Sequence, residues 1–477
     1  MADYDVDVAI LGAGTAGMSA YREARKYTDR IALIDGGPLG TTCARVGCMP
    51  SKLLIAAADA AHAAKTTAQF GVNTPAPTVD GKAVMARVKA ERDRFVGFVL
   101  DAVDEFEPGH VIREHAQFVD DHTLKLGSGR NITARAIVIA VGSRPNAPAA
   151  FKAAGDRLII NDDVFDLDDL PRSVAVFGGG VIGLELGQAL HRLGVRVELF
   201  GRDGFVGPLS DPSVKAYAAK SFAAEFPIHW RADTQITREG DDVVVRWADG
   251  EDRGESRFDY LLSAAGRRSN LDRIGLESTS LTLNPNGAPD YDPLSARVGD
   301  THIFIAGDAS NDLPILHEAA DEGRLAGENA ARLPDAYRRG RRTGLGVVFT
   351  DPQIGLAGQS YQALVDAGAE FEIGEVSFED QGRARVTGRN QGLLRVYGEA
   401  GTGQLLGAEM IGPDAEHLAH LLAWQIDAGH SVSRTLQNPF YHPVVEEGVR
   451  TALRDLNAKL GFGPNPPLRC IDCGPGA

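Results

Sequence analysis

The sequence predicts a multidomain α/β protein, with two consecutive strand–glycine turn–helix units and a separate α+β domain towards the C-terminal end. The chain has 477 residues, several times the usual size of one domain, so several hydrophobic cores are expected. Its apolar fraction of 43% and charged fraction of 24% argue against disorder, and its 55 glycines indicate many tight turns. The third observation is a glycine-rich turn pattern that occurs twice.

The first unit begins with the apolar run Val6–Leu11. A glycine turn with Gly12, Gly14 and Gly17 follows, then a helical stretch and a second apolar run that ends at Asp35. In a Rossmann-like unit the first glycine allows the tight turn, the second lets the backbone approach a pyrophosphate, and the third lets helix and strand pack closely. An acid after the second strand can bind both ribose hydroxyls. We expect this unit to bind a dinucleotide.

The same pattern returns later in the chain. Its parts are the strand Val174–Phe177, the turn glycines Gly178, Gly180 and Gly183, a long helix beginning near Leu184, and a strand over Val195–Phe200. A single glycine motif is a weak signal, but two copies in the same strand–turn–helix context are not expected by chance. The sequence therefore predicts two bound dinucleotides.

The second unit differs from the first at the position that selects the nucleotide. Its second strand is followed by Gly201 and Arg202 instead of an acid. An arginine here favours the 2′-phosphate of NADPH, so we expect NADPH ahead of NADH. Two alternatives stay open, because Asp203 or Glu198 could turn towards the ribose and Arg202 could be a solvated loop charge.

Other apolar runs complete the two units and begin a further domain. Strands are predicted over Ala136–Val141, which leads into Gly142, and over His302–Ala306, which leads into Asp308. We add Gly142, Gly266 and Asp308 to the candidate cofactor contacts. From Gly344 onward, the strand-like runs Leu393–Tyr397 and Gln404–Ile411 and a helix over Glu416–Gly429 indicate a separate α+β domain.

The four cysteines occur as two close pairs, which indicates redox chemistry in a reducing compartment rather than a structural framework. Cys43 and Cys48 come soon after the first acid, Asp35, and can close a disulfide in or near one helical turn. Beside a flavin, one thiol of such a pair can attack a substrate disulfide while the other exchanges electrons with the ring. The alternative is two buried structural cysteines.

A histidine and a carboxylate near the C-terminal end form a candidate base and its orienting group. His442 and Glu447 lie in the segment Pro439–Gly448. A neutral imidazole can take the proton of a dithiol, and a carboxylate on the other ring nitrogen fixes its tautomer. Alone, this pattern would more often be a surface feature.

Charge and hydropathy exclude some partners. The net charge of −16 disfavours nonspecific binding to nucleic acid or anionic lipid. The chain enters a strand directly, and no stretch is long and apolar enough to span a bilayer, so we expect a cytoplasmic, soluble protein. The basic run of Arg338, Arg339, Arg341 and Arg342 is interpreted as a solvated linker face rather than a phosphate-binding patch.

Taken together, these residues resemble the class I pyridine nucleotide-disulfide oxidoreductases over nearly the whole chain, and most closely their dihydrolipoyl dehydrogenase branch. Leu316–Gly323 and Val181 favour this branch over the glutathione branch. The resemblance implies that the dinucleotides are FAD and NAD(P). Residues 1–150 and 271–343 would form the FAD-binding domain, 151–270 the NAD(P)-binding domain, 344–460 the dimerisation domain, and 461–477 a flexible cysteine-containing tail.

The resemblance also implies roles for single residues. Gly12, Gly14, Gly17 and Asp35 would hold the adenosine diphosphate of FAD, and Asp308 its ribityl chain. Lys52 would lie by the flavin and pair with Glu185. Cys43 would be the interchange thiol and Cys48 the thiol facing the flavin. His442, with Glu447 as its partner, would act across a homodimer on the other subunit's cysteines.

Three positions depart from the family pattern. The usual paired glycines before the first cysteine are Gly40 and Thr41 here, and Arg45 stands where asparagine is common. Tyr441 stands before His442 where lipoamide enzymes carry a small residue, and it either narrows the disulfide pocket or packs at the dimer interface. The substrate is therefore less constrained by the sequence than the reaction type.

The second cysteine pair, Cys470 and Cys473, lies outside the family pattern. Its position resembles the thiol shuttles of large thioredoxin reductases and mercuric reductases. Two thiols cannot complete a four-ligand zinc site alone, so no metal site is predicted. A redox or metal-handling role and an incidental tail both stay open.

Three functions are compatible with the sequence. The leading hypothesis is oxidation of a free or protein-bound dihydrolipoyl group by NAD(P). The second is NADPH-driven reduction of another small disulfide or a metal ion, with the tail as shuttle. The third is a mainly structural flavoprotein dimer in a multienzyme complex, which degraded active-site residues would indicate, and none is degraded.

Overall fold

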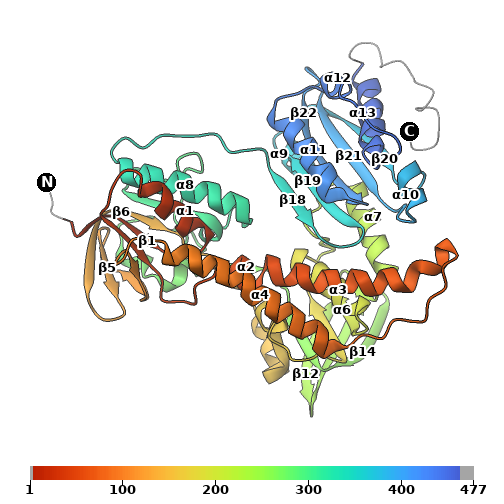
Figure 1. The fold of residues 1–477 in the computed structure, drawn as a ribbon, viewed down its shortest axis with the longest axis horizontal. Helices are drawn as coiled ribbons and strands as arrows, with labels where there is room; N and C mark the ends of the chain where they lie inside the picture. Colours follow the sequence, from red (N-terminus) through yellow and green to blue (C-terminus); the bar gives the residue numbers. More distant parts are fainter. Residues whose placement is uncertain (1–3, 462–477) are drawn as a thin grey trace.

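The first glycine turn follows the carboxyl end of a central strand of a seven-stranded sheet in the computed structural model, which describes residues 4–461 (Figure 1). The strand order is β3-β2-β1-β6-β5-β4, with β17 also on β6. The strands are β1 (Val6–Leu11), β2 (Ile31–Ile34), β3 (Val111–Ile112), β4 (Ala116–Phe118), β5 (Thr123–Leu126), β6 (Asn131–Ile139) and β17 (Ile303–Ile305). The pairs among β3, β2, β1, β6 and β17 are parallel, as expected for a nucleotide-binding unit.

Two helices cover one face of this sheet. They are α1 (Thr15–Ala24) and α8 (Leu316–Arg332), which pack against each other. A Cβ built on Gly323 would lie 2.2 Å from the Ala16 carbonyl oxygen, so only glycine allows the helices to approach this closely. Their small residues form one apolar core with Val8 and Ile10 of β1.

A second, five-stranded parallel sheet carries the second glycine turn, in the order β11-β10-β9-β15-β8. Its elements are β8 (Leu158–Ile160), α5 (Asn161–Val164), β9 (Ser173–Phe177), α6 (Val181–Arg192), β10 (Arg196–Phe200), α7 (Pro212–Ala223), β11 (Ile228–His229) and β15 (Tyr260–Ser263). The helix α6 begins at Val181 rather than near Leu184, because the Gly180 carbonyl already accepts the Leu184 N–H at 2.9 Å.

Two smaller sheets accompany the second unit. The antiparallel strands β12 (Asp233–Glu239), β13 (Asp242–Asp249) and β14 (Asp252–Phe258) form one of them. The other is the ribbon of β7 (Ser143–Pro145) with β16 (Arg267–Ser269), at the passage between the two units. Short 3-10 helices lie over Thr67–Phe70, Ala149–Arg157, Asn270–Arg273, Leu276–Ser278 and Gly307–Ala309.

A third unit follows the arginine-rich linker and is built on a five-stranded antiparallel sheet in the order β18-β19-β22-β21-β20. Its elements are β18 (Leu345–Val348), β19 (Gln353–Gly358), α9 (Tyr361–Asp366), β20 (Phe371–Ser377), α10 (Gly382–Val386), β21 (Leu393–Glu399), β22 (Leu405–Gly412), α11 (Ala415–Asp427), α12 (Val432–Thr435) and α13 (Glu447–Leu460). The predicted α+β character of this part is confirmed.

Three helices lead from the first unit to the second: α2 (Thr42–Val46), α3 (Cys48–Thr66) and α4 (Gly81–Asp104). Figure 1 shows α3 and α4 running side by side, and α3 also packs on α6 of the second unit. The candidate cysteines therefore lie between the two units. Within residues 4–461, no helix has the length and hydropathy of a membrane span.

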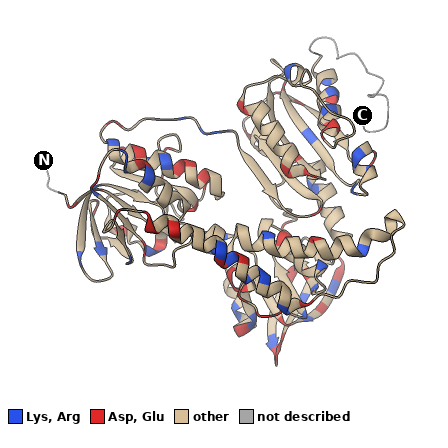
Figure 2. Cartoon of the chain, in the orientation of Figure 1, with Lys and Arg blue, Asp and Glu red and all other residues tan. Residues whose placement is uncertain are grey.

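Figure 2 shows the arginine-rich linker running from the first unit to the third, and two of its arginines pair with acids of the first unit. Arg341 pairs with the buried Glu322 and with Asp312 at 2.9 Å, and Arg342 pairs with Asp321 at 3.1 Å. These arginines are therefore neutralised by carboxylates, which agrees with the linker interpretation and leaves no bare cationic patch there.

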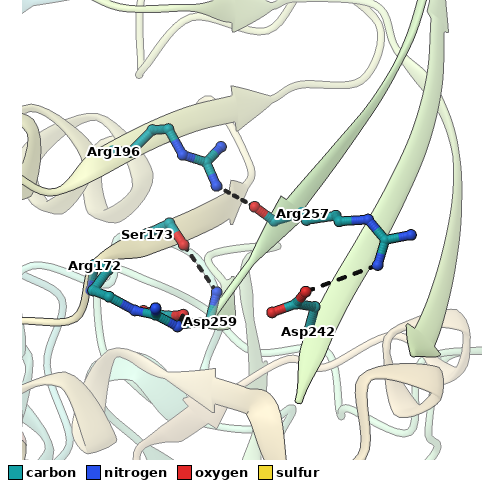
Figure 3. A pocket seen from close by; sticks show the side chains of 6 residues that line it. All are labelled: Arg172, Ser173, Arg196, Asp242, Arg257 and Asp259. Carbon is teal, nitrogen blue, oxygen red and sulfur yellow. Dashed lines mark hydrogen bonds and ion pairs between the residues drawn. The ribbon is translucent and has the colours of Figure 1, made fainter. Parts of the chain in front are cut away.

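A polar cavity of about 260 Å³ opens beside Ser173 and Arg196, which begin β9 and β10 (Figure 3). The glycine turn follows the opposite ends of the same strands, so this cavity is not the nucleotide site. Its charged side chains pair with one another: Arg172 pairs with Asp259 at 2.7 Å, for example. The lining carries three arginines and two aspartates, so most of its charge is compensated within the cavity.

Candidate redox site

The two candidate thiols lie on consecutive helices rather than within one helical turn. Cys43 is in α2, and Cys48 begins α3 after Gly47, whose φ of −129° and ψ of −114° interrupt the helix. Cys43 is half-buried, Cys48 is exposed, and both are free. The Cys43 thiol donates a hydrogen bond to Cys48.

This hydrogen bond shifts the pKa values of the two thiols in opposite directions. The bond from Cys43 and the nearby Lys52 ammonium lower the pKa of Cys48 to about 7 against the opposing effect of burial. Cys43 keeps the proton of this hydrogen bond, and the bond together with burial raises the pKa of Cys43. Cys48 is thus the thiolate of the pair at neutral pH, the form that acts in thiol–disulfide chemistry.

Lys52 is held by a buried carboxylate of the second unit. Its Nζ lies 3.0 and 2.8 Å from the two carboxylate oxygens of Glu185, which is 4% exposed. Glu185 also accepts the Phe349 backbone N–H at 2.9 Å, and the ammonium lies 4.5 Å from the centre of the Phe349 ring. The ammonium therefore has a fixed place one helical turn after Cys48.

The first glycine turn has the shape of a pyrophosphate cradle. A Cβ on Gly12 would lie 2.3 Å from the Ala140 carbonyl oxygen, and one on Gly17 would lie 1.7 Å from the Gly12 carbonyl oxygen. A Cβ on Gly14 would meet nothing within 4 Å, and Gly14 caps α1 without any side-chain hydrogen bond. The N–H groups at the start of α1 thus face open space, which fits the diphosphate of FAD.

Asp35 stands beside this turn, where a ribose would be bound. Its carboxylate accepts the backbone N–H groups of Ala13 and Gly37, each at 2.7 Å. These bonds fix the carboxylate at the end of β2, next to the glycine turn. The candidate FAD residues are thus brought together as the sequence predicted.

The second turn repeats this geometry. A Cβ on Gly178 would lie 2.3 Å from the Ala264 carbonyl oxygen, and one on Gly183 would lie 1.9 Å from the Gly178 carbonyl oxygen. Gly180 caps α6 without a side-chain bond, and its Cβ position lies 3.7 Å from the ring of the exposed Phe205. The start of α6 is therefore accessible to a second diphosphate.

Gly201 occupies the position that Asp35 has in the first unit. Gly12 donates its N–H to the last residue of β2 at 2.8 Å, and Gly178 donates to the last residue of β10 at 2.9 Å, so the two units superpose in register. A Cβ on Gly201 would lie 3.0 Å from the Trp230 carbonyl oxygen. An acid in this position would crowd the backbone of Trp230.

Glu198 and Asp203, the two acids that could bind the ribose instead, differ in the contacts that their carboxylates already make. Glu198 accepts the Ser256 hydroxyl at 3.0 Å and lies 3.5 Å from His229, so it faces β14. Arg202 is 90% exposed and pairs with Asp203 at 3.1 Å. The side chain of Arg231 reaches the same turn, 2.9 Å from the Cβ position of Gly204.

Gly142, Gly266 and Asp308 meet at the β7–β16 ribbon. Both glycines have positive φ, +64° and +86°, and flank the ribbon where a side chain would be strained. The Asp308 carboxylate accepts the Ser143 hydroxyl at 2.7 Å and lies 3.9 Å from Nε of Arg267. These contacts join Asp308 of the first unit to the ribbon.

The candidate base lies in the third unit, just before α13. His442 Nδ1 lies 3.1 Å from each carboxylate oxygen of Glu447, which is 3% exposed and also accepts a guanidinium N–H of Arg450 at 2.8 Å. The proton on Nδ1 is therefore directed at Glu447, and Nε2 is left as the base. The side chain of His442 is 51% exposed and Tyr441 is 80% exposed.

The structure does not join this pair to the cysteines of the same chain. Over residues 4–461, no hydrogen bond or ion pair connects His442 or Glu447 with Cys43 or Cys48. Cys470 and Cys473 lie outside the described residues. Within those residues no group of His, Cys, Asp and Glu side chains has the arrangement of a metal site.

Sequence reasoning missed several residues that contact the candidate site residues or the segments that carry them. Phe349 was not identified, because its role comes from a backbone N–H. Asn161 donates to the Val46 carbonyl at 2.8 Å, and the sequence signals only that this carbonyl lacks its helical donor, through Pro50. Glu322 accepts the Gly307 N–H at 2.7 Å, next to Asp308, and burial raises its pKa to about 7.

The fold and the two cradles define a dinucleotide-dependent oxidoreductase, and sequence comparison identifies its family. Residues 6–323 match the family described as pyridine nucleotide-disulphide oxidoreductase, and residues 345–453 match the dimerisation domain of the same family. The chain belongs to this family. It is therefore a flavin-dependent oxidoreductase that uses FAD and NAD(P), which confirms the cofactors expected from the sequence.

Relatives with different activities match the chain almost equally well. A mercuric reductase of Shigella flexneri is 29% identical, covering 94% of this chain and 80% of the relative. A dihydrolipoyl dehydrogenase of Geobacillus stearothermophilus is 28% identical, covering 93% and 94%. Among solved structures, LpdA from Mycobacterium tuberculosis has a TM-score of 0.80 at 24% identity, covering 94% of this chain and 99% of that chain. The family is established by the two family matches, and these relatives leave the substrate open.

Proposed function

We propose that this enzyme oxidises dihydrolipoyl groups through Cys43 and Cys48 and passes the electrons to a pyridine nucleotide. The observation that carries the proposal is the polarised thiol pair, in which Cys43 donates to Cys48 beside the Lys52 ammonium. Such a pair combines a stabilised thiolate with a second thiol that can exchange with a substrate. Dihydrolipoyl dehydrogenases are among the relatives that match over nearly the full chain.

The proposed reaction starts from the Cys43–Cys48 disulfide. A substrate thiolate attacks the sulfur of Cys43, and Cys48 leaves as a thiolate that Lys52 stabilises. The second substrate thiol then displaces Cys43, which releases the oxidised cyclic disulfide and leaves two reduced cysteines. FAD, which Gly12, Gly14, Gly17 and Asp35 would hold, would supply a two-electron carrier between the dithiol and NAD(P)⁺.

His442 is proposed to take the proton of the substrate thiol. Its Nδ1 proton is directed at Glu447, so Nε2 is the available base. His442 lies in the part of the chain that matches a dimerisation domain. We therefore propose a homodimer in which the pair His442–Glu447 serves the cysteines of the other subunit.

NADP(H) is proposed as the preferred nucleotide. The acid that would bind a 2′-hydroxyl is replaced by Gly201, and Glu198 is engaged with Ser256 and His229. Arg202 and Arg231 meet at the same turn and offer two guanidinium groups to a 2′-phosphate.

The test is the rate of dihydrolipoamide oxidation by the purified holoenzyme, with NAD⁺ and NADP⁺ offered separately. Rapid turnover with faster use of NADP⁺ is expected. Negligible turnover by an enzyme that retains its flavin would refute the dihydrolipoyl assignment.

The second candidate is NADPH-driven reduction of another disulfide or of a metal ion. The matches to mercuric reductases and the cysteines Cys470 and Cys473 favour it. NADPH oxidation that depends on added Hg²⁺ or oxidised glutathione, and is lost on deletion from Leu468 onward, would support this candidate with the tail as shuttle.

A further inference from the structure

The carbonyl of Val46, between the two cysteines, has no donor on its own segment. In a continuous helix it would accept the N–H of residue 50, but that residue is proline and carries no N–H. The helix is interrupted at Gly47, and α3 restarts at Cys48. A buried carbonyl without a partner costs about 1–3 kcal/mol, so a donor from elsewhere is expected.

Asn161 supplies this donor from the second unit. Its side-chain Nδ2 donates to the Val46 carbonyl at 2.8 Å and to the Asp162 carboxylate at 2.9 Å. Both partners accept only, which fixes the orientation of the amide. Asn161 is 4% exposed, and within the described part of the chain its Oδ1 has no hydrogen-bond partner. The amide is therefore committed to donation towards the cysteine segment.

The position of Asn161 makes this a contact between units. It is the first residue of α5 and directly follows β8 of the nucleotide-binding sheet. Asp163 accepts the Ile160 N–H at 2.9 Å, which holds the start of α5 in place. Val46, in contrast, ends α2, which carries Cys43.

We propose that Asn161 is a positioning residue for the Cys43–Cys48 pair: by holding the Val46 carbonyl it fixes the break between α2 and α3 and keeps the two thiols in hydrogen-bonding register. This inference rests on the proposed role of the two cysteines as the redox pair. It assigns to the nucleotide-binding unit a direct influence on the thiols. Asn161 itself contacts neither thiol and acts through the backbone of Val46.

The charged and titratable groups around the pair are distributed over several elements. Cys48 is influenced by Cys43 of α2, Lys52 of α3 and Glu185 of α6. On the side of Asn161, burial raises the pKa of Asp162, while Arg267 and Arg45 oppose that rise. None of these groups replaces the donor that the Val46 carbonyl receives from Asn161.

Loss of this donor should weaken the hydrogen bond from Cys43 to Cys48. The Cys48 thiolate would then be less stabilised, and its pKa would rise from about 7. Asn161→Ala removes the donor and the volume, whereas Asn161→Leu keeps a similar volume, adds no charge and removes the donor. A role in space-filling alone would leave the Leu variant unchanged.

The experiment follows the alkylation of Cys48 by iodoacetamide in the reduced holoenzyme as a function of pH, with each cysteine distinguished by peptide mass. Both variants are expected to shift the midpoint upward by about 0.5–1 pH unit. Asn329→Ala is the matched control, because Asn329 is a fully buried asparagine that donates to the Ser295 and Tyr337 carbonyls within the first unit. It should lower the melting temperature and leave the midpoint unchanged.

Folded Asn161 variants with the wild-type midpoint would overturn the inference. If Asn161→Ala does not fold, the Leu variant decides. Alkylation requires no turnover, so a wild-type enzyme that fails to oxidise dihydrolipoamide would refute the proposed function without affecting this result. Normal turnover with an unshifted midpoint would refute only the role of Asn161.

Discussion

Glu447 holds His442 through both of its carboxylate oxygens, each 3.1 Å from Nδ1. The carboxylate is buried while half of the imidazole is exposed, so the ring is oriented from the inside and presented outward. The exposed part of the ring can therefore meet a group from outside the third unit, which supports the proposal of a site shared between two subunits.

Replacing Glu447 with glutamine should lower kcat by about 10- to 100-fold, because the imidazolium formed during proton transfer loses its counter-charge. Steady-state kinetics with dihydrolipoamide would measure this loss. Glu446→Gln is the control for removing one carboxylate beside α13, and equal kcat values for the two variants would contradict the role of Glu447.

Replacing Cys43 with serine should abolish dithiol oxidation and leave FAD bound. The Ser hydroxyl can still donate to Cys48, but it cannot form the disulfide that accepts the substrate's electrons. Flavin absorbance of the purified variant and turnover with dihydrolipoamide are the two measurements. Appreciable turnover by the flavin-loaded variant would rule out the dithiol mechanism.

Replacing Arg202 and Arg231 together with glutamine should raise the KM for the NADP nucleotide by about tenfold, since charge-assisted contacts to a phosphate are lost. The KM for the NAD nucleotide should change little, because that ligand has no 2′-phosphate. Arg238→Gln is a control on the neighbouring strand β12, where Arg238 bonds to the Gly240 carbonyl at 2.7 Å. Equal increases in KM for both nucleotides would show that the two arginines do not recognise the 2′-phosphate.

His302 should make the protein less stable in mild acid. Its ring stacks on His122 at 3.6 Å, and its Nε2 donates to the Asp121 carbonyl at 2.6 Å. Burial, followed by the charge of His122, lowers the pKa of His302 below 6.5. The folded state therefore binds this proton less readily than the unfolded state. The free energy of unfolding is highest above the pKa of the histidine in the unfolded chain and decreases as pH falls through its pKa in the folded protein.

Thermal denaturation of wild type and His302→Asn over mildly acidic pH would test this. The wild type should lose melting temperature below about pH 6.5, where the unfolded histidine begins to take its proton. The His302→Asn variant should have a lower melting temperature at neutral pH, and its melting temperature should depend less steeply on pH. Identical slopes would exclude His302 as the group that titrates.

The sequence was most informative where backbone geometry demands a particular residue. Gly12 and Gly178 have positive φ and cannot carry a Cβ, so their spacing identified both turns. It was least informative where a contact joins distant segments. The amide of Asn161 reaches Val46 across the boundary of two units, and nothing in the sequence identifies Asn161 as the donor.

The arrangement of the cysteines was predicted only in part. Their proximity was clear from the spacing of Cys43 and Cys48, but the break at Gly47 was not expected. Pro50 was the available signal, because it deprives the Val46 carbonyl of a donor. The antiparallel strands β12, β13 and β14 were also missed, although Gly240 and Gly250 turn their hairpins with positive φ.

Lys52 should stabilise the Cys48 thiolate, and replacing it with methionine tests this on the enzyme's own thiol. The methionine keeps an apolar stem of similar length and removes the charge that lowers the pKa of Cys48, so the alkylation midpoint should rise above about 7. Lys65→Met is a close control: Lys65 also lies on α3 and donates to α6, through the Arg192 carbonyl at 3.0 Å.

Removing Lys52 leaves Glu185 with one remaining donor, the Phe349 N–H, so some stability is lost as well. A Lys52→Met, Glu185→Leu double variant removes that stranded carboxylate. If its midpoint also rises, the loss of the ammonium is the cause; if it returns to the wild-type value, the shift in the single variant came from the unpaired Glu185 charge.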